Sequence, residues 1–373
     1  MARRIRRFSG EGVKDAAVSL HPFTTEDDLL LTLSRFHRED SDDVVLLMHG
    51  LTSASDLFTM PEIRNMVSHL LDEGFGDVWA LDFRMSNRFP YNTGGRRWSL
   101  DDIALFDYPA AMAELRRHIG DRRVHVFAHC LGALSFSMSL FGGVVRDDDF
   151  ASLVVNSVSL TPRVPAWSKV KMAVGPDFAD YVLGSPYIDP RFTEAPKLSG
   201  RWLMSKVISA FHPECDEPAC HMQSFMWASG RPGFFMHENL APETHRHDRL
   251  ADINGASTVH YYRHIRKMVK AGKAVRYDVR DPKLKALPAD YLARAAEITT
   301  PILFTTGDHN RIFTDSNIVC HRALSKIVPG RHELEVLPGY GHIDPILGKN
   351  AHQDVYPRIV EHFKKHSTDR KAA

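Results

Sequence analysis

One cysteine, Cys130, occupies a position that would make it a nucleophile. The run Val126-Phe-Ala-His-Cys-Leu-Gly-Ala133 joins an apolar, strand-like segment to a helical one, and small residues lie two positions before and two positions after the cysteine. This pattern is typical of a tight strand-to-helix turn that lifts a nucleophile above a sheet. Free N–H groups and the helix dipole at such a turn favour a thiolate. We therefore expect Cys130 to attack acyl carbonyls, against the simpler interpretation that it is a small buried core residue.

His342 is the predicted general base. It follows an apolar run that is expected to be the last strand, in the glycine-rich segment Pro338-Gly-Tyr-Gly-His-Ile-Asp344. The chain has 21 histidines, so only its position singles this one out. A base placed after the final strand can reach a nucleophile at the same edge of a sheet. Because an unperturbed thiol is only a few per cent thiolate near neutral pH, an adjacent imidazole would assist it.

Short apolar runs alternate with amphipathic segments in two parts of the chain. This alternation predicts an α/β fold with a mostly parallel central sheet flanked by helices. Strands are expected at residues 29–35, 44–50, 78–83, 124–128, 151–156, 301–307 and 334–338. Helices are expected at residues 57–72, 100–119, 133–141, 317–327 and 352–365.

The alternation stops in the middle of the chain. We expect residues 1–160 to form the first part of the core, residues 161–300 an inserted cap, and residues 301–373 the second part of the core. The cap segment is rich in proline, histidine, methionine and aromatic residues, as in Met222-Gln-Ser-Phe-Met-Trp227. These side chains are expected to pack the cap and to line an apolar acyl pocket.

Four potential metal ligands lie close together in the cap: His212, Cys215, Cys220 and His221. Their spacing matches no standard zinc pattern, and the prolines between them favour a packed loop. We therefore expect no metal there. Metal-dependent chemistry in the cap is a further possibility, beside the two functions described below.

The residues on either side of the cap resemble the α/β-hydrolase superfamily, over Val44–Asn156 and Pro301–Phe363. The segment from Gly341 to Ala351 is similar to the histidine segment of acid and gastric lipases, and to hydrolase-like parts of proteins that carry cholesterol-oxidase-type flavin domains. No glycine motif for dinucleotide binding is present, so no flavin or other cofactor is expected. Most members use serine; a cysteine at this turn resembles polyhydroxyalkanoate synthases and dienelactone hydrolases.

The resemblance implies further site residues. The backbone N–H groups of Leu51, after His49-Gly50, and of Leu131, after the nucleophile, would form an oxyanion hole. The group that orients the histidine normally follows the penultimate strand, here Pro301-Ile-Leu-Phe-Thr-Thr-Gly307. The usual register places it at Asn310 rather than at an aspartate, and Asp308 is a near-equal rival. Asp344 is expected to be structural, because it is too close in sequence to His342.

These features predict an acyl-transfer enzyme that works through a Cys130 thioester on a hydrophobic ester or thioester substrate. A thioester passes its acyl group readily to an alcohol or an amine as well as to water, so a hydrolase, an acyltransferase and a cyclase all remain open. The alternative is a non-catalytic protein that binds a small molecule on the same fold, since a fold does not imply a function.

Composition restricts the partners and the compartment. The chain of 373 residues has 47 Lys+Arg against 46 Asp+Glu, a net charge of +1 that gives no electrostatic reason to expect nucleic acid. The basic start is not followed by an apolar run, and no segment is long and apolar enough to span a bilayer. Four cysteines in a chain of this length do not make a disulfide framework, which favours a cytoplasmic protein with reduced thiols. The oligomeric state is left open.

Overall fold

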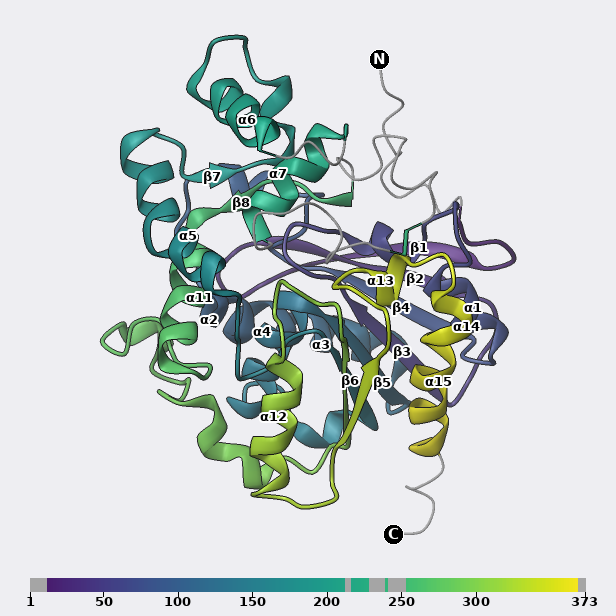
Figure 1. The fold of residues 1–373 in the computed structure, drawn as a ribbon. Helices are drawn as coiled ribbons and strands as arrows, with labels where there is room; N and C mark the ends of the chain where they lie inside the picture. Colours follow the sequence, from purple (N-terminus) through teal and green to yellow (C-terminus); the bar gives the residue numbers. More distant parts are fainter. Residues whose placement is uncertain (1–11, 212–215, 228–238, 241–252, 368–373) are drawn as a thin grey trace.

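An eight-stranded, mostly parallel sheet forms the centre of the computed structural model, in the order β1-β2-β4-β3-β5-β6-β9-β10 (Figure 1). The structure describes residues 12–211, 216–227, 239–240 and 253–367. Its strands are β1 (Ala17–Thr24), β2 (Leu30–His37), β3 (Asp43–Met48), β4 (Asp77–Asp82), β5 (Arg123–His129), β6 (Ser152–Asn156), β9 (Ile302–Gly307) and β10 (Glu333–Leu337). Strand β2 runs opposite to the others in this sheet, so its pairs with β1 and β4 are antiparallel, while the remaining neighbouring strands are parallel. The predicted fold class is therefore confirmed.

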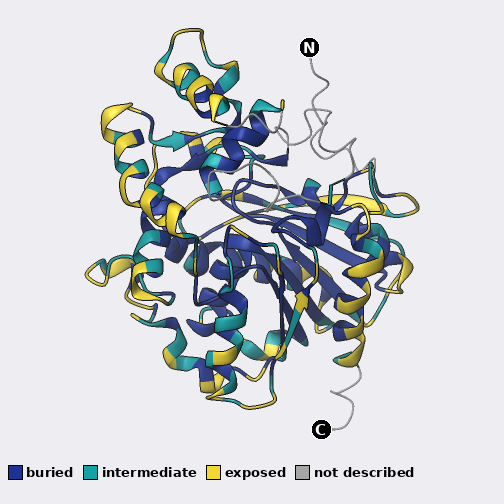
Figure 2. Cartoon of the chain, viewed as in Figure 1, coloured by how far each residue is buried: buried dark blue, intermediate teal, exposed yellow. Residues whose placement is uncertain are grey.

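The central strands read as continuous apolar runs because helices cover both faces of the sheet. One face carries α1 (Met66–Asp72) and α15 (Tyr356–Lys365), and the other carries α3 (Tyr108–Ile119), α4 (Cys130–Phe141) and α12 (Ser316–Ser325) (Figure 1). Figure 2 shows the strands as the most buried part of the molecule. Among the residues that the structure describes, no helix combines the length and the apolar character needed to cross a membrane.

Several elements differ from the sequence-based expectation. The closing helix predicted at 352–365 is divided into α14 (Ala351–Asp354) and α15 (Tyr356–Lys365). The predicted helix at 57–72 is wrong in its first half: a short 3-10 helix (Ser55–Phe58) comes first, and α1 begins only after Asn65, whose side chain accepts a hydrogen bond from the Ser68 N–H. Pro61 lies between the two pieces, where its ring and missing N–H interrupt a helix. Strand β1 was not predicted, because it is an edge strand with mostly exposed side chains and lacks an apolar run.

The segment that the sequence predicts to be a cap lies between β6 and β9, and its described elements add no strand to the main sheet. Its described elements are α5 (Ala166–Asp177), η5 (Phe178–Val182), β7 (Tyr187–Ile188), η6 (Pro190–Glu194), α6 (Gly200–Ala210), α7 (Pro218–Trp227), β8 (Ser257–Thr258), α11 (Val259–Ala271), η7 (Pro282–Leu284) and η8 (Tyr291–Glu297). A small apolar core of its own includes Ile188, Phe192, Ile208 and Met222. The outer faces of α5 and α6 are largely exposed (Figure 2), and they carry apolar side chains such as Val174.

Two glycines allow the main chain to pack closely where β5 turns into α4. A Cβ added to Gly132 would lie 2.1 Å from the carbonyl oxygen of His49. A Cβ added to Gly50 would lie 2.9 Å from the Cβ of Cys130. The first turn of α4 therefore sits directly against the end of β3, and only a residue without a side chain fits at position 132.

Gly132→Ala tests this close packing. We expect the free energy of unfolding to fall by roughly 1–3 kcal/mol, the typical cost of overpacking, because a backbone carbonyl cannot move aside as a flexible side chain can. The matched control is Gly200→Ala at the start of α6, where an added Cβ meets no atom of the described chain within 4 Å. Thermal melts followed by circular dichroism compare the two, and equal melting temperatures would contradict the packing argument.

Candidate active site

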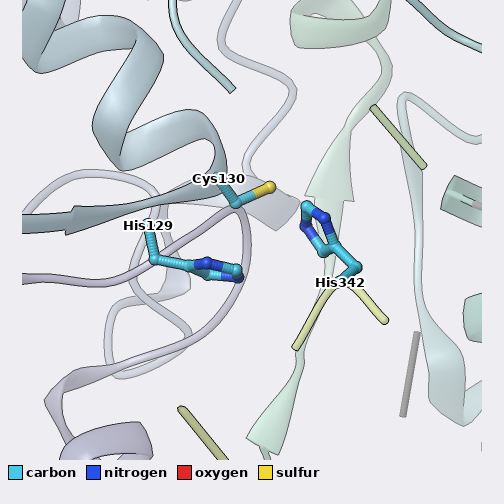
Figure 3. A group of neighbouring side chains, drawn as sticks. All are labelled: His129, Cys130 and His342. Carbon is cyan, nitrogen blue, oxygen red and sulfur yellow. The ribbon is translucent and has the colours of Figure 1, made fainter. Parts of the chain in front are cut away.

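Cys130 lies at a sharp turn, with β5 ending at His129 and α4 beginning at Cys130 itself. Its φ angle is +54°, in the left-handed region that residues with a Cβ seldom adopt. Such a conformation costs about 1–3 kcal/mol and persists only where its surroundings enforce it. The turn holds the sulfur at the floor of a cavity and directs it toward the His342 ring (Figure 3).

Backbone N–H groups surround the sulfur. The main-chain groups of Leu51 and Leu131 hydrogen-bond to the thiol, and each of these contacts favours its ionised form. Burial has the opposite and larger effect and raises the pKa of Cys130 to about 12. The backbone donors favour a thiolate, as the sequence predicts, but burial outweighs them and the thiol rests neutral.

His49 explains the direction of one of these donors. Its Nδ1 lies 2.7 Å from the carbonyl oxygen of Gly50, and the ring is fully buried. Burial lowers the pKa of His49 to about 4, so a neutral ring donates this hydrogen bond. In a trans peptide the C=O and the following N–H point in opposite directions. Fixing the Gly50 carbonyl on His49 therefore turns the Leu51 N–H toward the sulfur.

His342 meets Cys130 from the loop after β10. Its ring is buried, and burial, followed by the neighbouring His129, lowers its pKa well below the usual range. His342, His129 and Cys130 each present a nitrogen or sulfur atom, and these atoms lie within 4.8 Å of one another (Figure 3). The resting pair is thus a neutral thiol beside a neutral imidazole.

The structure does not bring the predicted orienting residues to this imidazole. The Asn310 side-chain oxygen accepts hydrogen bonds from the backbone N–H groups of Ile312 and Phe313, so it shapes the loop after β9. Asp308 is about half exposed and accepts from the Gly339 N–H at 2.7 Å. The Nδ1 atom of His342 has no hydrogen-bond partner among the described residues. Aromatic neighbours hold its ring, with centroids at 4.9 Å for His129 and 6.1 Å for Phe313.

The sequence analysis assigned no role to His129. It is the last residue of β5, and its side chain lines the cavity beside Cys130. Its Nδ1 lies 2.7 Å from the side-chain oxygen of Asn156, and the Asn156 amide donates to Thr305 at 2.8 Å. His129 and Asn156 lie opposite each other at the ends of the paired strands β5 and β6, and Thr305 lies on β9. Only knowledge of that register would have revealed this network.

A cavity of about 70 Å³ opens above Cys130. Its walls come from both the core and the cap and are mainly apolar. The cap contributes residues of α5, α7 and α11, among them Met172, Met226, Trp227, Tyr262 and Ile265. The two described members of the cap ligand group, Cys220 and His221, lie on α7, whereas His212 and Cys215 fall outside the described residues.

Comparisons with known proteins place the chain among hydrolases. The alpha/beta hydrolase family profile matches residues 44–355, most of the chain. The chain belongs to the alpha/beta hydrolase family. Its similarity to Triacylglycerol lipase 1 of Arabidopsis thaliana is 23% identity over 363 residues, covering 92% of this chain and 86% of the plant protein. Together with further lipase relatives, this supports an enzyme of the esterase type.

Solved structures agree on the alpha/beta hydrolase fold. DcsB in complex with its substrate analogue aligns with a TM-score of 0.55 at 11% identity, over 96% of this chain and 100% of that chain. MenH from S. aureus aligns with a TM-score of 0.51 at 11% identity, over 90% of this chain and 99% of that chain. At these identities the likeness concerns the fold alone.

The neutral state of the thiol predicts how its reactivity depends on pH. Because burial raises the pKa of Cys130 to about 12, the thiolate fraction should grow about tenfold per pH unit between pH 7 and pH 10. The alkylation rate of Cys130 by iodoacetamide, measured by mass spectrometry of its peptide, should follow that slope. Circular dichroism checks that the fold persists across this range. A plateau below pH 8 would reveal a thiolate already formed at neutral pH and would contradict the burial argument.

Proposed function

We propose that this protein is an acyl-transfer enzyme that forms a thioester on Cys130, with His342 as the general base. The observation that carries the proposal is the setting of one sulfur atom. It lies between two backbone N–H groups and an imidazole, on the floor of an apolar cavity. Such an arrangement supplies a nucleophile, oxyanion donors and a base at one point.

The resting charges determine how the first step would proceed. As the sulfur attacks the carbonyl carbon, the S–H proton moves to His342, so no buried thiolate has to exist beforehand. The N–H groups of Leu51 and Leu131 receive the oxyanion, and each such donor typically contributes about 3–4 kcal/mol to transition-state stability. The protonated His342 then donates its proton to the leaving group, which departs and leaves a thioester on Cys130.

In the second step, water, an alcohol or an amine gives its proton to His342 and attacks the thioester carbonyl carbon. The carbon–sulfur bond then breaks, the acyl product leaves, and His342 returns the proton to the Cys130 sulfur. Water makes the enzyme a hydrolase, whereas the other acceptors make it an acyltransferase or a cyclase. The lipase names of its relatives favour an ester substrate with an apolar acyl group. The apolar cavity walls favour the same class of acyl group, because they offer few polar partners.

Within this proposal, Asn310 contributes to positioning His342, whereas Asp308 has little effect on it. Asn310 is buried and holds the N–H of Phe313, whose ring contacts His342, so it acts on the base through the loop. Asp308 is half exposed and accepts a hydrogen bond from the loop after β10.

We also propose a cytoplasmic location, since the Cys130 and Cys320 thiols are free and a reducing compartment keeps them so.

Turnover of a panel of p-nitrophenyl esters tests the proposal. Cys130→Ala and His342→Ala should each lower kcat by at least about 10³-fold, because nucleophile and base act as a unit. Esters with apolar acyl groups should be preferred over acetate in kcat/KM. Activity retained by Cys130→Ala would contradict the thioester mechanism. A wild type that binds but never turns over any ester would favour the binding-protein alternative.

Variants of the loop after β9 complete this comparison. Asp308→Ala should keep kcat within about threefold of wild type. Asn310→Ala should lower kcat roughly tenfold, whereas Asn310→Asp should recover most of it, since a carboxylate still accepts both loop N–H groups. A loss in Asp308→Ala as large as that in His342→Ala would instead make Asp308 the orienting acid.

A further inference from the structure

Three buried side chains at the site are of the kinds that bind metal ions in proteins. His129, Cys130 and His342 are each less than a tenth exposed, and their candidate donor atoms lie within 4.8 Å of one another. Figure 3 shows the sulfur and the two imidazoles gathered around one space. Thiolate sulfur and imidazole nitrogen are the ligands that zinc prefers in proteins.

The network behind His129 prepares it to act as a ligand. Asn156 donates its amide N–H to Thr305, so its oxygen accepts the Nδ1 proton of His129 at 2.7 Å. This contact places the ring proton on Nδ1 and leaves a lone pair on Nε2. A hydrogen bond from the distal nitrogen to a side-chain acceptor is the usual support of a metal-binding histidine.

His342 offers the second nitrogen. Its Nδ1 lacks a hydrogen-bond partner among the described residues. A buried ring nitrogen without a hydrogen-bond partner costs free energy. Coordination of a cation by the ring nitrogen that faces it would replace the missing hydrogen bond. The backbone donors at Leu51 and Leu131 already point at the sulfur. Such N–H contacts stabilise a thiolate after a metal has replaced its proton.

We propose that His129, Cys130 and His342 bind one Zn²⁺ ion, and that this ion inhibits the enzyme reversibly. On binding, the S–H bond breaks and its proton leaves to solvent, a zinc–sulfur bond forms, and the two imidazoles donate lone pairs. No oxidation or reduction takes place. The binding stands on the geometry alone, whereas the inhibition rests on the proposed function, because the ion occupies the nucleophile.

The geometry needs only small adjustments. Zinc takes sulfur at about 2.3 Å and imidazole nitrogen at about 2.0–2.1 Å, so the donor atoms must approach one another by roughly 1 Å. The fourth position of a tetrahedral ion then faces the cavity above Cys130. A water molecule or a substrate oxygen can occupy it.

Native mass spectrometry of the chelator-treated, full-length protein with added ZnCl₂ tests the binding. We expect a complex of one zinc per chain that is lost in Cys130→Ser and weakened at least tenfold in His129→Gln, while both variants keep the wild-type circular dichroism. Cobalt(II) provides a spectroscopic signature, because a thiolate ligand gives a sulfur-to-metal charge-transfer band. That band should be present in the wild type and absent in Cys130→Ser.

The chain offers a matched control. His21, Glu114 and His118 form a second group of potential ligands, away from the site. His118→Ala should leave both the zinc affinity and the cobalt band unchanged. Loss of zinc in His118→Ala but not in His129→Gln would move the ion to that group and overturn the proposal, as would a wild type that binds no zinc.

Activity separates the two parts of the idea. Zinc at a stoichiometric concentration should abolish ester hydrolysis, and EDTA should restore it. If Cys130→Ala keeps its turnover, the proposed function fails, yet the mass and cobalt measurements still decide the metal site. If turnover requires Cys130 but zinc binds without inhibiting, the regulatory part is overturned.

Discussion

The left-handed backbone at Cys130 is the constraint on which the rest of the site depends. A φ of +54° at a residue with a side chain costs about 1–3 kcal/mol, and close packing on both sides enforces it. Gly132 lets α4 rest against the His49 carbonyl, and Gly50 leaves room for the Cys130 side chain. The same approach of α4 to the end of β3 brings the Leu51 and Leu131 N–H groups to one sulfur. The same packing thus holds the proposed nucleophile and its proposed oxyanion donors together.

Desolvation governs the electrostatics of this site. Burial raises the pKa of Cys130 and lowers the pKa values of His342 and His129, so these three groups rest in their neutral forms. An isolated buried charge would be expensive here, because no carboxylate among the described residues hydrogen-bonds to the imidazole. Neutral ligands and a neutral thiol suit proton transfer during attack. The same neutral imidazoles and thiol could also bind a cation, because no positively charged group among them would repel it.

How much the sequence predicts depends on whether a feature is local. The turn at Cys130 and the buried parallel strands carry local signals, namely small residues at fixed spacing and unbroken apolar runs. Both the fold class and the strand-to-helix turn at Cys130 could therefore be predicted. The His129–Asn156 contact joins neighbouring strands, and it depends on a register that no local pattern reveals. The residues of the cavity wall are even farther from Cys130 in the sequence. Met172 and Tyr262 come close to Cys130 only because of how the cap folds. At Asn310, register arguments predicted an orienting group, but the side chain is used by its own loop.

Cys130 is the proposed carrier of the acyl group, and intact mass measurement tests this role most directly. Wild-type protein is mixed briefly with a panel of acyl thioesters and aryl esters, quenched in acid and weighed beside Cys130→Ala. The wild type should gain the mass of one acyl group, located on the Cys130 peptide, and the variant should gain none. An adduct of equal size on Cys130→Ala, or product release by the wild type with no adduct under any quench time, would contradict it.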